Sequence, residues 1–253
     1  MKLAGAQVIG SLVLAASLAA CFGGESSSPL GDRGGLDAGS LGDDAGPATV
    51  QVLIVDGTTG APVPNAVVAI ERGGLYLPIA DYSKANPAYV FGAIAGADGR
   101  FTITLPGGVA GFHAFANDYL YVGKKFDSQK DTGVFTIAIE PRPAQIAKPT
   151  MTNASLSPSP ATAGATITLH ADLATGAATD AISDEVVLVD PKTNRAIALA
   201  PPRAGPDRDH YPDGTYTATF VAPVTPGTYT YALAATTGQC SNADTVTLQL
   251  VVQ

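Results

Sequence analysis

Residues 49–71 of the chain read TVQVLIVDGTTGAPVPNAVVAIE. The first eight residues and the last five are rich in β-branched side chains, which favour extended strands. The ten residues between them hold two glycines, two prolines and an asparagine, the residues that punctuate turns. The stretch therefore predicts two strands joined by a turn-rich connection, and no helical period interrupts it.

Similar alternating runs follow at residues 101–106 (FTITLP), 111–116 (GFHAFA) and 133–139 (GVFTIAI). In the first of them Phe101, Ile103 and Leu105 share one face, because successive side chains of a strand point to opposite sides. Glycine, proline and aspartate separate the runs. Short strands divided by such turns predict an all-β sandwich over residues 48–143.

Short motifs recur in a fixed order through this unit, at residues 55–68 (VDGTTGAPVPNAVV), 97–101 (ADGRF), 105–108 (LPGG) and 118–119 (DY). The order resembles the carboxypeptidase regulatory-like family, a transthyretin-like sandwich of about seven strands. The resemblance implies an accessory module without catalytic residues of its own. The chain departs from the family pattern at Asn65 and Asp118, where glycine is usual, and in a longer segment at residues 72–96.

A second unit is predicted over residues 144–253, after a proline-rich hinge at residues 140–143 that should be extended and semi-rigid. Its predicted strands are residues 165–173, 185–190, 215–220, 229–235 and 244–250. Turn signals recur about every ten residues, which is typical of a sandwich. Residues 213–220 and 226–229 resemble immunoglobulin-like filamin or bacterial surface repeats. The sequence thus predicts two β-sandwich domains in tandem.

The first 21 residues predict export. Lys2 precedes a largely apolar stretch with small residues near its end, the layout of a secretory signal. Residues 18–21 (LAAC) resemble the lipobox of bacterial lipoproteins, which implies acylation of Cys21 and a membrane anchor. Phe22 follows the cysteine instead of aspartate, and by the same resemblance the outer membrane is the expected address. An ordinary signal peptide with a chance cysteine is the alternative.

Residues 22–47 are dominated by Gly, Ser, Asp and Ala, with the tripeptide DAG at 37–39 and again at 44–46. Too few large apolar side chains are present to offset the entropy of ordering. The segment is predicted to be a flexible tether. A calcium loop is the weaker interpretation, because the EF-hand spacing is missing.

Composition and chemistry-bearing residues argue against several function classes. The formal net charge of −8 disfavours nucleic acid as a partner. With Cys21 lipidated, Cys240 is predicted to be an unremarkable free thiol. His113 and His170 alternate with apolar neighbours and are predicted to face solvent, and His210 falls in a polar loop. No metal, cofactor or catalytic motif is predicted, and a hydrolase site assembled across the domains stays a remote alternative.

The most interesting surface combines residues 72–96 with residues 117–126. Its candidate binding residues are Tyr76, Tyr82, Tyr89, Phe91, Tyr119 and Tyr121. Tyrosine supplies contact area at little entropic cost, so an exposed patch would suit recognition of a glycan, a peptide or an envelope protein. The alternative is that these rings cap the open end of the sandwich as a satellite core.

These patterns together predict a lipid-anchored envelope protein that is not an enzyme and acts as a binding or adhesion module. A structural spacer or assembly subunit without its own ligand is the alternative.

Overall fold

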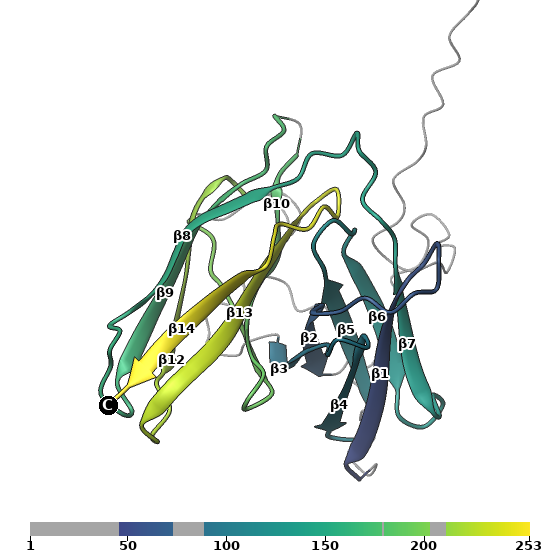
Figure 1. Cartoon of the computed structure of the whole chain (residues 1–253), viewed down its shortest axis with the longest axis horizontal. Helices are drawn as coiled ribbons and strands as arrows, with labels where there is room; N and C mark the ends of the chain where they lie inside the picture. The colour runs from purple at the N-terminus through teal and green to yellow at the C-terminus, as the bar shows by residue number, and fades with distance from the viewer. Residues whose placement is uncertain (1–45, 73–88, 179, 203–210) are drawn as a thin grey trace, which may run out of the picture.

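The computed structural model describes residues 46–72, 89–178, 180–202 and 211–253. All regular secondary structure in these ranges is β-strand, which confirms the all-β prediction (Figure 1). The strands of the first half are β1 (Ala48–Asp56), β2 (Val67–Arg72), β3 (Tyr89–Ile94), β4 (Arg100–Leu105), β5 (Val109–Phe115), β6 (Val122–Asp127) and β7 (Val134–Ile139). Those of the second half are β8 (Thr150–Ser157), β9 (Thr166–Ala174), β10 (Ile182–Asp190), β11 (Arg195–Ala198), β12 (Gly214–Val221), β13 (Gly227–Thr237) and β14 (Val246–Val252).

The first sandwich pairs a sheet of order β4-β1-β7 with a sheet of order β3-β2-β5-β6. Strand β1 is antiparallel to β4 and parallel to β7. Because its side chains alternate, Val50, Val52 and Ile54 are buried in the core between the two sheets. Three phenylalanine rings, Phe112, Phe126 and Phe135, meet at the same core.

The second sandwich pairs a sheet of order β11-β10-β13-β14 with a sheet of order β12-β9-β8. All pairings within these two sheets are antiparallel. Ile167, Leu169, Leu188 and Leu233 are fully buried between the sheets. Each half of the chain therefore has a hydrophobic core of its own.

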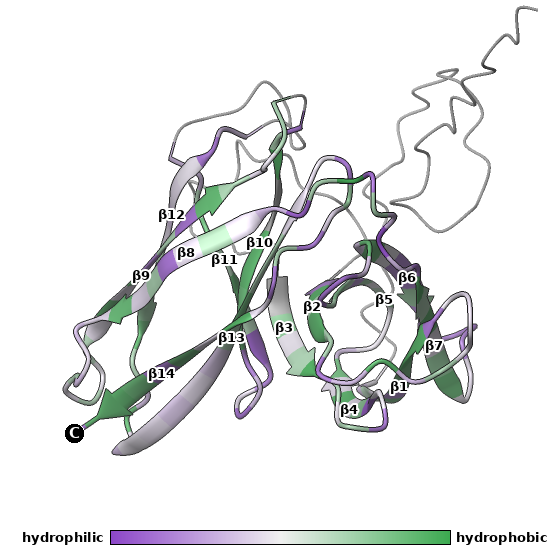
Figure 2. Ribbon diagram, turned by 45° about the horizontal axis from the view of Figure 1, so that its top comes forward, coloured by the Kyte–Doolittle hydropathy of each residue, from purple (hydrophilic) through white to green (hydrophobic). Residues whose placement is uncertain are grey.

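The two sandwiches pack face to face along a third apolar cluster. Strand β3 lies against β10 and β11, and β2 lies against β10 (Figures 1 and 2). Val67, Ala69 and Phe115 from the first sandwich meet Val187 and Val189 from the second. The inner strands β2, β5, β10 and β13 are consequently buried on both faces, and the molecule has four layers of sheet.

This packing overturns the expectation that His113 faces solvent. His113 is 1% exposed, because the face of β5 opposite the first core is covered by the second sandwich. In the sequence, a strand buried on one face differs from a strand buried on both faces only in the polarity of every second residue. In β5 these residues are Gly111, His113 and Phe115, and the polar His113 among them wrongly indicated an exposed face. His170 is half-buried beside Ser155, whose hydroxyl lies 3.1 Å from its Nε2.

The proline-rich connection is hydrogen-bonded to the first sandwich. The Leu120 N–H donates to the Glu140 carbonyl at 2.8 Å, and the Arg142 N–H donates to the Asp118 carbonyl at 2.8 Å. The Tyr121 N–H donates across the interface to the Cys240 carbonyl at 2.7 Å. The first two bonds hold the connection against the first sandwich, and the third joins the two sandwiches directly.

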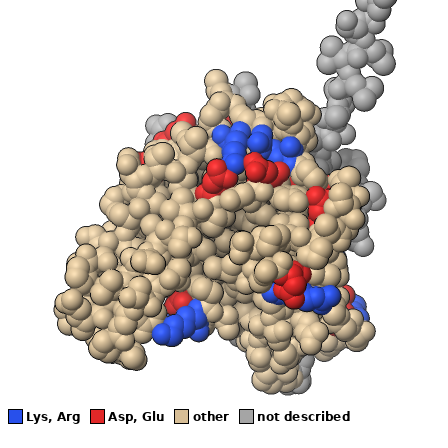
Figure 3. Space-filling view, in the orientation of Figure 1, with Lys and Arg blue, Asp and Glu red and all other residues tan. Residues whose placement is uncertain are grey.

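A group of charged side chains lies where the two sandwiches meet, near the top of the view in Figure 3. Lys148 Nζ lies 3.0 Å from Asp118 Oδ1 and 2.5 Å from Asp244 Oδ1, so it bridges the two sandwiches. The hydrogen bond from Lys148 lowers the pKa of Asp118. The bond to Asp244 raises the pKa of Lys148, against the effect of burial.

Replacing Lys148 by methionine is expected to lower the free energy of unfolding by no more than about 1 kcal/mol at pH 7, because both carboxylates are largely exposed. The Asp118 contribution is present above its unfolded pKa of 3.8 and is lost as the pH falls through the lower folded value. Urea unfolding at pH 7 and pH 3 measures this contribution to stability. Lys130→Met, which removes the Lys130–Asp127 ion pair within the first sandwich, is the control. An equal difference between wild type and variant at both pH values would contradict the assignment.

Asn65 and Asp118 adopt positive φ angles of 57° and 66°. These are the two positions at which the resembled family usually has glycine. A left-handed backbone is open to glycine and, less readily, to Asn and Asp, whose short polar side chains tolerate it. Asn65 and Asp118 are therefore compatible with the left-handed backbone that the structure has at these positions.

Candidate functional site

The predicted aromatic surface does not form one exposed patch in the described chain. Tyr76 and Tyr82 lie outside the described residues, as does the side chain of Tyr89. Phe91 and Tyr119 are half-buried and pack against the first core. Tyr121 is 3% exposed within the cluster between the sandwiches, so its assignment to a binding surface is wrong. Phe91 and Tyr119 therefore belong to the first core, and Tyr121 belongs to the cluster between the sandwiches.

Tyr119 has a defined structural role. Its hydroxyl donates to Asp56 Oδ2 at 3.0 Å, while Asp56 Oδ1 accepts from the backbone N–H groups of Thr58 and Thr59 at 2.9 and 2.7 Å. The Thr59 N–H contributes most to lowering the pKa of Asp56. Two residues that are 63 positions apart in the sequence are thus joined at one turn, and both stabilise the fold.

A buried polar network lies between the sandwiches. His113 Nε2 lies 3.5 Å from Glu71 Oε1, and His113 Nδ1 is hydrogen-bonded to the Tyr121 hydroxyl. Gly111 provides the space, because a Cβ at this position would lie 2.9 Å from Glu71 Oε1. Glu71 and His113 are 4% and 1% exposed, which closes this network to substrates. Its role is to join the sheet of the first sandwich to the interface.

Cys240 differs from its prediction. It is 3% exposed and disulfide-bonded, so the expectation of a free thiol is wrong. Cys21, the predicted lipidation site, lies outside the described residues, as does His210.

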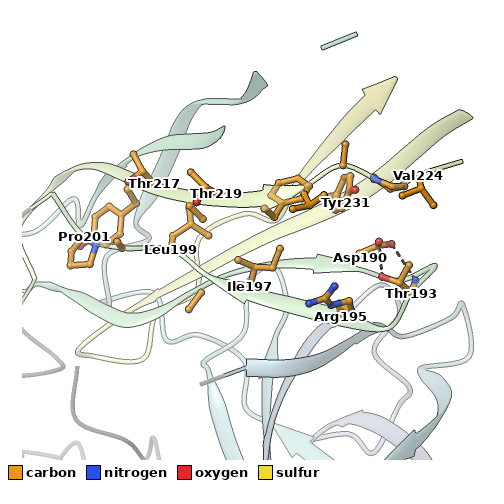
Figure 4. Close-up of a pocket in the computed structure, with 18 of the residues that line it drawn as sticks. Asp190, Thr193, Arg195, Ile197, Leu199, Pro201, Thr217, Thr219, Val224 and Tyr231 are labelled. Carbon is orange, nitrogen blue, oxygen red and sulfur yellow. Dashed lines mark hydrogen bonds between the residues drawn. The ribbon is translucent and has the colours of Figure 1, made fainter. Parts of the chain in front are cut away.

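The second sandwich contains an apolar groove of about 840 Å3 between β11 and β12 (Figure 4). We call it the β11–β12 groove. Its lining includes Ile197, Leu199, Tyr216, Ala218, Phe220 and Tyr231. Ile197, Ala218 and Phe220 point toward the second core yet stay half-exposed, because the two sheets separate along this edge. Val221 and Val224 at the rim are 66% and 79% exposed, so the groove and its border form a continuous apolar surface.

The two ends of the groove differ (Figure 4). At one end Thr217 and Ala200 exchange two backbone hydrogen bonds, of 2.7 and 2.9 Å, which join β12 to the segment after β11. The other end carries Asp190, Thr193 and Arg195. Asp190 accepts from the Thr193 hydroxyl at 2.7 Å and from the Lys192 N–H at 2.9 Å, so its carboxylate is occupied. The exposed Arg195 guanidinium makes no hydrogen bond or ion pair with the described residues.

The described lining of the groove is mainly apolar and carries few groups of the kinds used in catalysis. Burial raises the pKa of Tyr231 to about 12, and burial also raises the pKa of Tyr216, so both phenols are neutral at physiological pH. The described lining contains no serine, cysteine or histidine that would act as a nucleophile or general base. Among the described residues no cluster of His, Cys, Asp and Glu is able to hold a metal ion. The same part of the chain has no helix long and apolar enough to span a membrane.

No model of a known protein family matches the chain, and no curated protein matches it. Among solved structures, a DUF3823 family protein from Parabacteroides merdae is 15% identical, with 82% of this chain and 100% of that chain covered and a TM-score of 0.28. The fibronectin(III)-like modules of CbhA from Clostridium thermocellum are 14% identical, with coverages of 82% and 94% and a TM-score of 0.29. A streptococcal ancillary pilin is 24% identical over 39% of this chain and 30% of its own, with a TM-score of 0.28. Likenesses at these TM-scores assign neither a family nor a function.

Sequence reasoning did not find the groove. Its core-facing residues look like those of any closed sandwich, and the opening depends on how far two sheet edges separate. One signal was available, since residues 220–224 (FVAPV) continue the apolar character of β12 past its end, where a turn is usually polar.

Proposed function

We propose that the chain is an exported, lipid-anchored protein of the cell envelope that binds a ligand in the β11–β12 groove and has no catalytic role. The open groove is the observation that carries the proposal. A closed sandwich buries its core-facing residues, whereas Ile197, Ala218 and Phe220 remain half-exposed here. Concave apolar surfaces with a few polar groups at one end are the usual form of a binding site.

The first sandwich supplies the base of the binding module. The resemblance of its motifs to the carboxypeptidase regulatory-like family supports an accessory role, and its signature residues Asp56 and Tyr119 are used for the fold. The tether at residues 22–47 would carry the module away from the membrane.

A structural spacer is the second candidate, and the shared interface favours it. The third apolar cluster and the Lys148 bridge join the sandwiches into one body, as a spacer requires. A spacer has no need of an exposed groove, which is why binding is preferred.

The anchor is tested by the intact mass of the chain recovered from the membranes of a Gram-negative host. We expect cleavage before Cys21 and the added mass of acyl chains, and we expect Cys21→Ala to release the protein from the membrane fraction. The chain has two cysteines and Cys240 is disulfide-bonded, so a lipid on Cys21 requires that Cys240 pairs with a cysteine of another molecule, because one sulfur cannot carry both a lipid and a disulfide. A chain whose Cys21 is found in a disulfide, or which keeps residues 1–20, would contradict the anchor.

Binding in the groove is tested with 8-anilinonaphthalene-1-sulfonate, an apolar anion whose fluorescence rises in apolar surroundings. We expect saturable binding to the native protein and at least a tenfold loss of affinity in Ala218→Trp, because the indole would fill the groove. Val134→Trp, on an exposed strand of the first sandwich, is the control and should bind as wild type does. Near-UV circular dichroism checks that each variant is native. No binding, or equal binding by Ala218→Trp, would refute the groove as a site.

A further inference from the structure

One edge of β12 has backbone groups that point into the groove. Both the N–H and the C=O of Thr217 bond outward to Ala200, away from the neighbouring strand β9. Backbone groups alternate sides along a strand, so Thr219 and Val221 also point outward. Beyond Thr217, no described residue pairs with this edge. The outward groups of Thr219 and Val221 therefore lie along an apolar groove without a protein partner among the described residues.

The opposite wall of the groove, formed by β11, also has backbone groups that point outward. Leu199 donates its N–H to Val186 in β10, so the neighbouring Ala198 points its backbone groups outward, toward β12. The two free edges run from the Ala200–Thr217 bridge toward the end that holds Arg195. The groove thus combines apolar side chains with free backbone donors and acceptors.

We propose that the ligand of this groove is an extended peptide segment that adds a strand to the free edge of β12. This inference rests on the proposed function, because it names the class of ligand that the groove takes. Strand addition draws its affinity from main-chain hydrogen bonds and its selectivity from the pockets that receive alternate side chains. The outward backbone groups of Thr219 and Val221 supply the main-chain hydrogen bonds. The space beside Ile197, Phe220 and Tyr231 supplies the pockets for side chains.

An acyl chain fits the groove less well than a peptide. A lipid would cover the outward N–H and C=O groups of β12 and give them no hydrogen bond, and burying such groups unpaired is costly. A peptide satisfies them as it fills the groove. The exposed Arg195 guanidinium at the open end favours a peptide that carries a carboxylate near one end. The expected ligand has apolar residues at every second position and an acidic group beside Arg195.

The probe is a synthetic library of heptapeptides with Val, Ile, Leu, Phe or Tyr at positions 2, 4 and 6, and Thr, Lys or Asp elsewhere. The full mature chain is used, and selected peptides are titrated by NMR. We expect binders with Kd below about 1 mM, a range that strand pairing in an open groove reaches. On binding, the amides of Thr219 and Val221 should become protected from exchange at least tenfold. The amides of Ala218 and Phe220, which face β9, should not change.

Two variations separate backbone pairing from side-chain contact. N-methylation is applied in turn to the two alternating sets of amides of a bound peptide. Methylation of one set should lower the affinity of the peptide at least tenfold, and methylation of the other set should change it little. Val221→Pro removes one outward donor from an edge strand, where proline is tolerated, and should weaken binding, while Val221→Thr keeps the donor and should bind as wild type does. Arg195→Gln should cost roughly two- to fivefold in affinity for peptides with an acidic end. The methylated peptides need no change to the protein, so they still separate backbone pairing from side-chain contact if Val221→Pro fails to fold.

The proposal is overturned if no library peptide binds while the anionic dye still does, an outcome that leaves the proposed function in place. It is also overturned if dodecanoate binds in place of every peptide, or if N-methylated peptides bind as well as their parents. Failure of both the dye and the peptides would remove the proposed function itself.

Discussion

Replacing Phe112 by alanine is expected to lower the free energy of unfolding by about 3–5 kcal/mol. Phe112 is fully buried, with ring centroids 5.8 Å from Phe126 and 5.1 Å from Phe135, and those two rings are themselves 5.1 Å apart. Removing the central ring leaves a cavity that its two partners cannot both fill. The loss is a large share of the 5–15 kcal/mol that typically stabilises a domain.

Urea unfolding followed by far-UV circular dichroism measures this loss, since the chain has no tryptophan to report on it. Phe112→Leu, which keeps most of the volume, is the matched control and should cost clearly less. Equal midpoints for the wild type and Phe112→Ala would show that this ring cluster does not hold the first core together.

The second large effect concerns the interface between the sandwiches. Gly92 in β3 has no side chain, and a Cβ there would lie 2.9 Å from both γ-methyl groups of Val189 and 3.1 Å from the Cβ of Ala196. Its N–H also donates across the interface to the Asn194 carbonyl at 3.1 Å. We expect Gly92→Val to cost about 1–3 kcal/mol through overpacking and to push the two sandwiches apart.

Calorimetry detects this change both as a lower Tm and as a loss of cooperativity between the sandwiches. Gly46→Val, at a position with no atom within 4 Å of the added Cβ, is the control and should unfold as wild type does. A double-mutant cycle sharpens the test, because Val189→Ala makes room for Gly92→Ala. The two changes should then couple favourably, whereas strictly additive costs would contradict the contact.

The all-β architecture was predictable from local sequence because strands and turns alternate in a regular pattern. The turn at Asp56 and the strand that contains Phe101, Ile103 and Leu105 carry that information within a few residues. What local sequence did not supply is the contact between the sandwiches. Glu71, His113 and Tyr121 are polar residues that look exposed along the chain and become buried only when a second sheet covers them.

The candidate site was harder to predict for a related reason. The tyrosines chosen from composition mark a region of the chain, whereas burial depends on neighbours far away in sequence, such as Val187 and Ala232, which share a buried cluster with Tyr121. The groove depends on the separation of β11 and β12, which no periodicity encodes. Composition located aromatic residues correctly and did not show which of them are accessible.

The proposed binding site requires the groove to be open in solution, and amide hydrogen exchange of the unliganded protein tests this directly. We predict that the amides of Thr219 and Val221 exchange at least a hundredfold faster than those of Ala218 and Phe220, which alternate with them and bond to β9. That alternation within one strand would show a free edge in a folded sheet. Equal protection of all four amides would show that another segment covers the edge, and the groove would then not be a binding site.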